Sequence, residues 1–143
     1  MPVFAMVFEE QPKSLAAEKK QGYINRLREI AKAEMAGQNL LTGDLYVHII
    51  WFHSVRSTGD IDNIAKNILD AMKHIVYEDD EAVVRCQIER VDIRDEDHTF
   101  SYRTASPPAF ETLEQRLSSK PKHVVYVEVG PVGPITIRSG PGG

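Results

Sequence analysis

Short apolar runs alternate with longer amphipathic stretches along this chain, and the alternation predicts a domain of strands and helices. Val3–Phe8 is apolar at every position, which is typical of a strand covered on both faces. Leu45–His53 carries β-branched and aromatic residues on both faces, so it is predicted to be a central strand. Val124–Val129 predicts a last strand.

Three amphipathic stretches predict helices. The first follows Ser14, a suitable N-cap, and extends to about Met35. Its basic and acidic residues alternate, which favours a solvated face with ion pairs over a phosphate-contacting surface. The third begins at the proline pair 107–108 and extends to about Leu117, since proline suits a first helical turn.

The second helix has the clearest pattern and follows a polar loop, Ser54–Gly59, that carries one basic residue, Arg56. One face is an apolar stripe, and the opposite face is charged. The stripe consists of Ile61, Ile64, Ile68, Met72, Ile75 and Val76, and the charged face of Asp62, Lys66, Asp70 and Lys73. We expect this helix to end in the acidic run Glu78–Glu81.

A strand is expected after the acidic run, with Val84, Cys86 and Ile88 on one face. The apolar phase then moves to Val91 and Ile93, which predicts a β-bulge or a change of neighbour near residue 90. Cys86 is interpreted as a core residue. Residues 95–97 predict a turn, and residues 98–102 predict the return strand of a hairpin.

The order of these elements indicates one α/β domain with a mixed β-sheet flanked by helices, because both short hairpins and helical crossovers are present. We place this domain at residues 1–130 and a Gly/Pro-rich C-terminal tail at residues 131–143. A length of 143 residues suits a single domain.

Charge changes this picture little at first. The chain has 17 Lys and Arg against 21 Asp and Glu, a formal charge of −4, and this acidic balance argues against a nucleic-acid partner, since polyanion binders usually have a basic surplus. The one cysteine excludes an internal disulfide, and the start of the chain has no signal-peptide pattern. No apolar stretch has the roughly 20 residues needed to span a bilayer. We therefore expect an intracellular, cytoplasmic protein without a membrane role.

Two acidic clusters, Asp60–Asp62 and Glu78–Asp80, flank the second helix and are the candidates for chemistry. Asp60 and Asp62 can reach one ion only if Asp60 precedes the helix, because residues two apart on a helix point to different sides. Of Asp79 and Asp80, only one is expected to face such a site. Carboxylate ligands without histidine or thiolate favour Mg²⁺ or Mn²⁺, and three carboxylates with open water positions suit phosphodiester cleavage.

Interpretations without a metal are equally open at this point. Asp60 can be a plain N-cap, with Asp62 favourable to the helix dipole. Lys66 can be an i,i+4 partner of Asp62, worth about 0.2–0.5 kcal/mol. The acidic run can be a solvated turn. His48 and His53 lie on opposite faces of their strand, and His48 is interpreted as a packed or hydrogen-bonded residue.

Three sequence blocks resemble the signature of RusA-type Holliday junction resolvases. The blocks are Asp60-Ile61-Asp62-Asn63-Ile64-Ala65-Lys66, then Leu69-Asp70-Ala71-Met72, then Val76-Tyr77-Glu78-Asp79-Asp80-Glu81-Ala82-Val83-Val84. Their order matches the family pattern of Asp-x-Asp-Asn-x-x-Lys, a helix end, and an aromatic residue before Asp-Asp. The direct resemblance covers about residues 60–84.

The resemblance implies a homodimeric, Mg²⁺-dependent endonuclease that resolves four-way DNA junctions by paired symmetric nicks in recombination and repair. By position, Asp60, Asp62 and Asp80 match the metal-binding carboxylates. Lys66 matches the motif lysine that contacts phosphate, which makes these four the implied catalytic residues. A prokaryotic or phage origin is also implied.

The chain departs from the family pattern in its basic residues. Family members carry Arg or Lys clusters before the Asp-x-Asp motif and near the N-terminus, where this chain has only Arg56 and Lys13. DNA contact is therefore expected from the helix around Lys19–Lys32, from Arg85–Arg94, or from the dimer as a whole. The alternatives to a resolvase are a non-catalytic DNA- or protein-binding module with the same fold, and a nuclease of other branched DNA.

Overall fold

The computed structural model describes residues 3–10, 17–55, 61–94 and 107–133. Within them a mixed β-sheet is flanked by α-helices, which confirms the predicted α/β class. The elements are β1 (Phe4–Phe8), α1 (Ala17–Glu34), β2 (Leu45–His53), α2 (Ile61–Met72), the 3-10 helix η1 (Asp80–Ala82), β3 (Val83–Asp92), α3 (Pro107–Ser118) and β4 (His123–Pro131).

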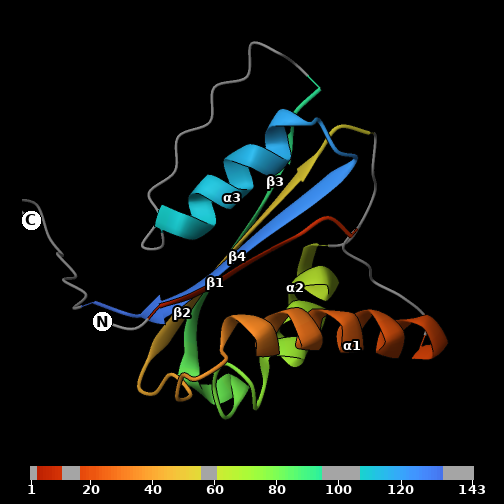
Figure 1. The fold of residues 1–143 in the computed structure, drawn as a ribbon. Helices are drawn as coiled ribbons and strands as arrows, with labels where there is room; N and C mark the ends of the chain where they lie inside the picture. The colour runs from red at the N-terminus through yellow and green to blue at the C-terminus, as the bar shows by residue number, and fades with distance from the viewer. Residues whose placement is uncertain (1–2, 11–16, 56–60, 95–106, 134–143) are drawn as a thin grey trace, which may run out of the picture.

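The sheet has four strands in the order β1-β4-β2-β3 (Figure 1). Strand β4 runs antiparallel to both β1 and β2, whereas β2 and β3 are parallel. Because parallel neighbours need a crossover connection, α2 lies on one face of the sheet between them, together with α1. Helix α3 covers the other face. The central position predicted for β2 is confirmed.

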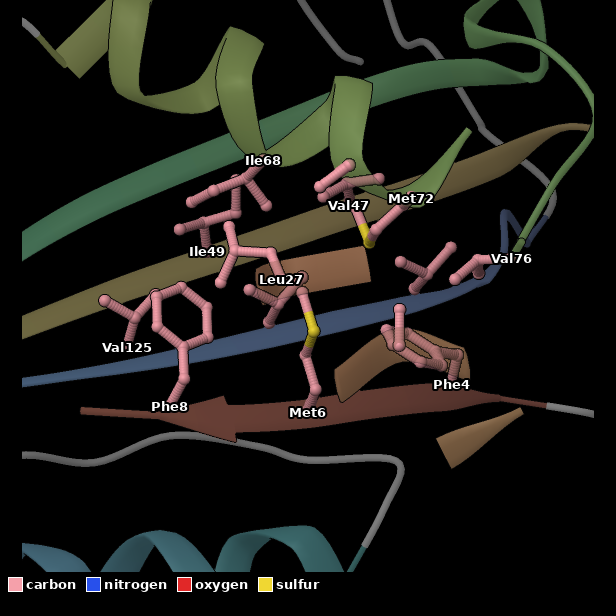
Figure 2. Close-up of a cluster of buried hydrophobic side chains, with 14 of the residues drawn as sticks. Phe4, Met6, Phe8, Leu27, Val47, Ile49, Ile68, Met72, Val76 and Val125 are labelled. Carbon is pink, nitrogen blue, oxygen red and sulfur yellow. The ribbon is translucent and has the colours of Figure 1, made fainter. Parts of the chain in front are cut away.

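The main hydrophobic core lies between the sheet and helices α1 and α2. Figure 2 shows side chains from β1, β2, β4 and both helices meeting there. Helix α1 contributes the buried residues Tyr23, Ile24, Leu27 and Ala31 at helical spacing, and Met35, just after the helix, continues this buried face. A smaller cluster on the opposite face joins Leu113 of α3 to Phe52 and Val124 of the strands. Covering both faces explains why β2 and β4 are apolar on both sides.

Helix α2 ends earlier than its apolar stripe predicts, at Met72 instead of in the acidic run. His74 adopts a positive φ of 68°, and its N–H donates to the Tyr77 carbonyl at 2.6 Å, so the chain turns there. Val76 remains fully buried despite lying outside the helix. The turn thus continues the buried stripe without helical backbone, which is why periodicity alone placed the helix end too late.

Strand β3 has its irregularity at Val84 and not near Arg90. The β2–β3 register shifts between Leu45 and Tyr46, and is then continuous as far as the last residues of both strands. The predicted bulge near residue 90 is therefore wrong, and β3 keeps β2 as its neighbouring strand throughout. The apolar phase changes because opposite faces of the strand are covered along its second half. Ile88 packs against the cluster under α1 and α2, whereas Val91 and Ile93 pack against the cluster under α3.

Cys86 is exposed, so its assignment to the core is wrong. It lies on the sheet face shared with Ile88, but β3 is the edge strand and its first half is only partly covered.

Several other expectations fall outside the described residues: the Ser14 cap, the end of the polar loop from Arg56 to Asp60, the turn at 95–97, the return strand at 98–102 and most of the tail. The described helices include none long and apolar enough to cross a membrane.

A buried carboxylate marks the sheet face beyond α3. Glu128 of β4 is 3% exposed and accepts hydrogen bonds of 2.7 Å from the hydroxyls of Tyr46 and Tyr126. Burial, followed by the hydrogen bond to Glu128, raises the pKa of Tyr46. The Tyr46 ring lies across Gly130, where an added Cβ would be 2.8 Å from ring atoms. Glycine is required at this strand position by the close approach of the ring.

We expect Gly130→Ala to destabilise the protein by about 1–3 kcal/mol, because the added methyl group displaces Tyr46 from a buried acceptor. Urea unfolding followed by circular dichroism measures this. Gly133→Ala is the matched control, since a Cβ there meets nothing within 4 Å. Equal stability of the two variants would contradict the role assigned to Tyr46.

Candidate functional site

The candidate acidic site lies in the turn between α2 and β3, where η1 begins with Asp80. The Oδ1 atom of Asp80 is buried and has no hydrogen-bond partner. A carboxylate oxygen removed from water without a donor is unfavourable unless a cation or a proton compensates it. This atom therefore has the environment that a cation ligand needs.

The Tyr77 hydroxyl lies near the carboxylates of both Asp80 and Asp70. The fully buried Tyr77 donates its hydroxyl to the Leu69 carbonyl at 2.8 Å. Burial raises the pKa of this hydroxyl, and the charges of the nearby Asp80 and Asp70 carboxylates and a hydrogen-bonding contact with the Asp80 side chain raise it further. The structure thus brings Asp80 to the last turns of α2. Asp70, which the sequence placed only on a charged helix face, also lies near the Tyr77 hydroxyl.

Asp79 takes a different direction from its neighbour. Its Oδ1 atom lies 3.8 Å from Lys73 Nζ, in an exposed ion pair. The two adjacent carboxylates therefore lie in different environments, Asp79 exposed beside Lys73 and Asp80 with a buried oxygen. That only one of them faces a metal site stays a prediction. Asp79 consequently serves as a natural control position.

Lys66 lies on α2 one turn before Asp70, with an exposed side chain. Residues at i and i+4 share a helix face, so Asp62, Lys66 and Asp70 form one row. A rise of about 1.5 Å per residue separates Asp62 from Asp70 by about 12 Å along the axis. Lys66 therefore lies between the start of α2 and the turn that holds Asp80.

The structure does not bring all predicted ligands together. Asp60 is outside the described residues, and Asp62 is the second residue of α2, with a side chain that is also outside the description. Among the side chains that are described, no group of three or more His, Cys, Asp or Glu could hold a metal ion. The set Asp60, Asp62 and Asp80 accordingly remains a prediction.

Arg28 of α1 fixes the end of α2 from the neighbouring helix. Its Nη1 atom donates to the carbonyls of Asp70, Ala71 and Lys73, at 3.4, 3.3 and 3.1 Å. A cation at a helix C-terminus satisfies carbonyls that have no partner in the helix and favours the helix dipole. The sequence pattern assigned Arg28 to a solvated face, because backbone acceptors on another helix leave no mark in a sequence.

The basic residues of α1 are largely occupied within the chain. Arg26 forms an ion pair with Glu10, and Lys32 lies 3.3 Å from Glu29. This arrangement supports the predicted ion-paired face of the first helix. On β3, Arg94 is paired with Asp92, whereas Arg85 is exposed without an ion pair in the described part of the chain.

The family profile described as Endodeoxyribonuclease RusA matches residues 7–100. The matched region includes both acidic clusters and extends from β1 through β3. Proteins of this class are endodeoxyribonucleases that act on branched DNA junctions. The chain belongs to the RusA family, as the sequence blocks predicted. A comparison with curated proteins found no match.

We expect Arg28→Ala to destabilise the protein by about 1.5–3 kcal/mol, since three carbonyls lose a charged donor. Arg26→Ala removes the same side chain from the same helix, but at an exposed ion pair, and should change the unfolding free energy much less. Denaturant unfolding of both variants gives the comparison. Similar losses in both would show that Arg28 has no special role at the end of α2.

Proposed function

We propose that this protein is a Mg²⁺-dependent endonuclease that resolves four-way DNA junctions by paired symmetric nicks, acting as a homodimer in recombination and repair. The observation that carries the proposal is the buried Asp80 Oδ1 atom without a hydrogen-bond donor, in a chain of the RusA family. A structural acidic turn has no need to bury such an oxygen.

Asp80 is proposed as a metal ligand together with Asp60 and Asp62, and the donor set fits a hard cation. All three ligands are carboxylates, which suit Mg²⁺ and also Mn²⁺. When bound, Mg²⁺ supplies charge neutralisation at the scissile phosphate and lowers the pKa of a coordinated water.

Lys66 is proposed to contact a phosphate of the DNA. Its exposed ammonium group lies on the row of α2 that joins the two acidic segments. A flexible, strongly hydrated point charge suits such a contact and offsets the repulsion between DNA and the carboxylates. Its charge also places a cation beside an otherwise acidic surface.

One observation favours the alternative of a non-catalytic binding module. Three basic side chains of α1 already have partners inside the chain: Arg26, Arg28 and Lys32. Few basic side chains of this helix are therefore available to contact DNA. Such a module would bind junctions or a protein without metal-dependent cutting. The remaining alternative is a nuclease of other branched DNA. Comparing cleavage of junction, flap and duplex substrates in one assay distinguishes it from a junction resolvase and from a non-catalytic module.

We expect the protein to nick a synthetic four-way junction at symmetric positions with Mg²⁺. Asp62→Asn and Asp80→Asn should each lower the cleavage rate by about 100-fold or more, because a lost ligand removes several kcal/mol of transition-state stabilisation. Asp79→Asn is the matched control and should retain the rate, since Asp79 faces Lys73. Cleavage products are resolved on denaturing gels.

Absence of cleavage with both Mg²⁺ and Mn²⁺ would contradict the enzyme assignment. Junction binding that persists without cutting, and that is insensitive to Asp80→Asn, would support the binding module instead. Cleavage of flaps in preference to junctions would change the substrate and leave the acidic site in place.

Metal binding can be tested without DNA. We expect millimolar Mg²⁺ to raise the melting temperature of the wild-type protein, because an ion that binds only the folded state stabilises it. Asp80→Asn should lose the increase and Asp79→Asn should keep it, as measured by differential scanning calorimetry. An equal increase in both variants would place the ion elsewhere.

A further inference from the structure

The outer edge of the sheet is formed by β3, which pairs only with β2 within the described residues. The four residues from Val84 to Gln87 are exposed, and Val84 is a large apolar residue with 53% exposure. Within the described ranges, this strand of ten residues has an unpaired outer edge whose backbone donors and acceptors can pair with another strand. This edge is therefore a candidate surface for association.

The direction of the backbone groups restricts which residues another strand can meet. The Ile93 N–H donates to the His53 carbonyl at 2.8 Å and so points toward β2. Because successive residues point in opposite directions, the backbone groups of Cys86, Ile88 and Arg90 point to the outer edge. An antiparallel copy of β3 must then pair even-numbered residues with even-numbered ones, and its two-fold axis must pass beside a residue.

We propose that β3 pairs antiparallel with the β3 strand of a second copy, about a two-fold axis at Gln87. An axis at Arg85, Glu89 or Arg90 would place like charges opposite each other. An axis at Cys86 or Ile88 would leave Arg85 and Glu89 without an opposite charge across the pair. The axis at Gln87 places Arg85 opposite Glu89, and symmetry repeats this pair. It thus provides cross-strand charge complementarity on both sides of the axis.

The side chains of this register are available at the surface. Arg85 and Gln87 are exposed, and the Glu89 side chain is 44% exposed beside His48. Paired residues of β2 and β3 share a sheet face, so all three side chains lie on the α3 side of the sheet, beyond the cluster that α3 covers. The pairing joins two four-stranded sheets into one continuous sheet.

This inference deepens the homodimer of the proposed function, and its test measures association instead of cleavage. In a Cys86→Ser background, Gln87→Cys places one cysteine at the axis. This cysteine lies directly opposite the same cysteine of the second copy, in a non-hydrogen-bonded antiparallel pair. The Cα atoms of such a pair are about 4.5 Å apart, which allows a disulfide to form. We expect a disulfide-linked dimer after mild oxidation of the folded protein.

The same background tests the register. Arg85→Cys and Glu89→Cys should each remain unlinked alone and should link when the two variants are mixed. Gln115→Cys on the exposed face of α3 is the control and should remain unlinked. Circular dichroism confirms that each variant is folded.

Charge reversal gives an independent measurement by sedimentation equilibrium. Arg85→Glu alone and Glu89→Arg alone should each weaken dimerisation roughly tenfold, because two cross-strand pairs change from attraction to repulsion. An equimolar mixture of the two should regain the wild-type association, since every pair in the mixed dimer is again opposite in charge.

A wild-type monomer at micromolar concentration would overturn the inference together with the homodimer. If the wild-type protein is a dimer but the Gln87→Cys variant forms no disulfide, only the proposed β3 surface is overturned. Linked dimers that fail to cut junctions would support the β3 pairing and contradict the nuclease, so the two failures are distinguishable.

Discussion

The parallel pairing of β2 with β3 is the constraint on which the rest of this structure depends. Parallel neighbours require the chain to return along the sheet before the second strand begins, and α2 makes that return. The motif Asp60–Lys66 therefore lies around the start of a helix, and Asp79–Asp80 lies between its end and the next strand. The acidic segments are related by the crossover itself, whatever ligand they hold.

The end of the crossover is the part that the structure controls most closely. Arg28 binds the last carbonyls of α2, and His74 turns the chain in the left-handed region. Tyr77 anchors the turn to the Leu69 carbonyl from inside the core. With these contacts in place, Asp80 is directed inward and Asp79 outward toward Lys73. The difference between two adjacent aspartates is thus produced by core packing and not by their chemistry.

Much of the fold could be predicted because hydrophobic periodicity reports burial. The bounds of β2, the start of α3 and the central place of β2 follow from apolar runs and a proline pair. The pattern gave the wrong helix end because a buried residue need not be helical. Val76 is buried in a turn, so the apolar stripe continues past the end of α2. The pattern failed again at Cys86, because an apolar residue in alternation looks the same on an edge strand as on a covered one.

For the site, the sequence blocks predicted the family and the candidate acidic residues. They did not predict the contacts that hold the end of α2 and the following turn in place. The partners of Arg28 are backbone carbonyls on another helix, and the approach of Asp70 and Asp80 to the Tyr77 hydroxyl depends on how the turn folds back. The acidic net charge, which first argued against DNA, is consistent with bases that serve the fold and with carboxylates proposed to bind a cation. The most direct measurement is a crystal structure with Mn²⁺, using its anomalous scattering. The account predicts a Mn²⁺ peak within coordination distance of Asp80 Oδ1, and a peak bound elsewhere, with Asp80 Oδ1 still without a partner, would contradict it.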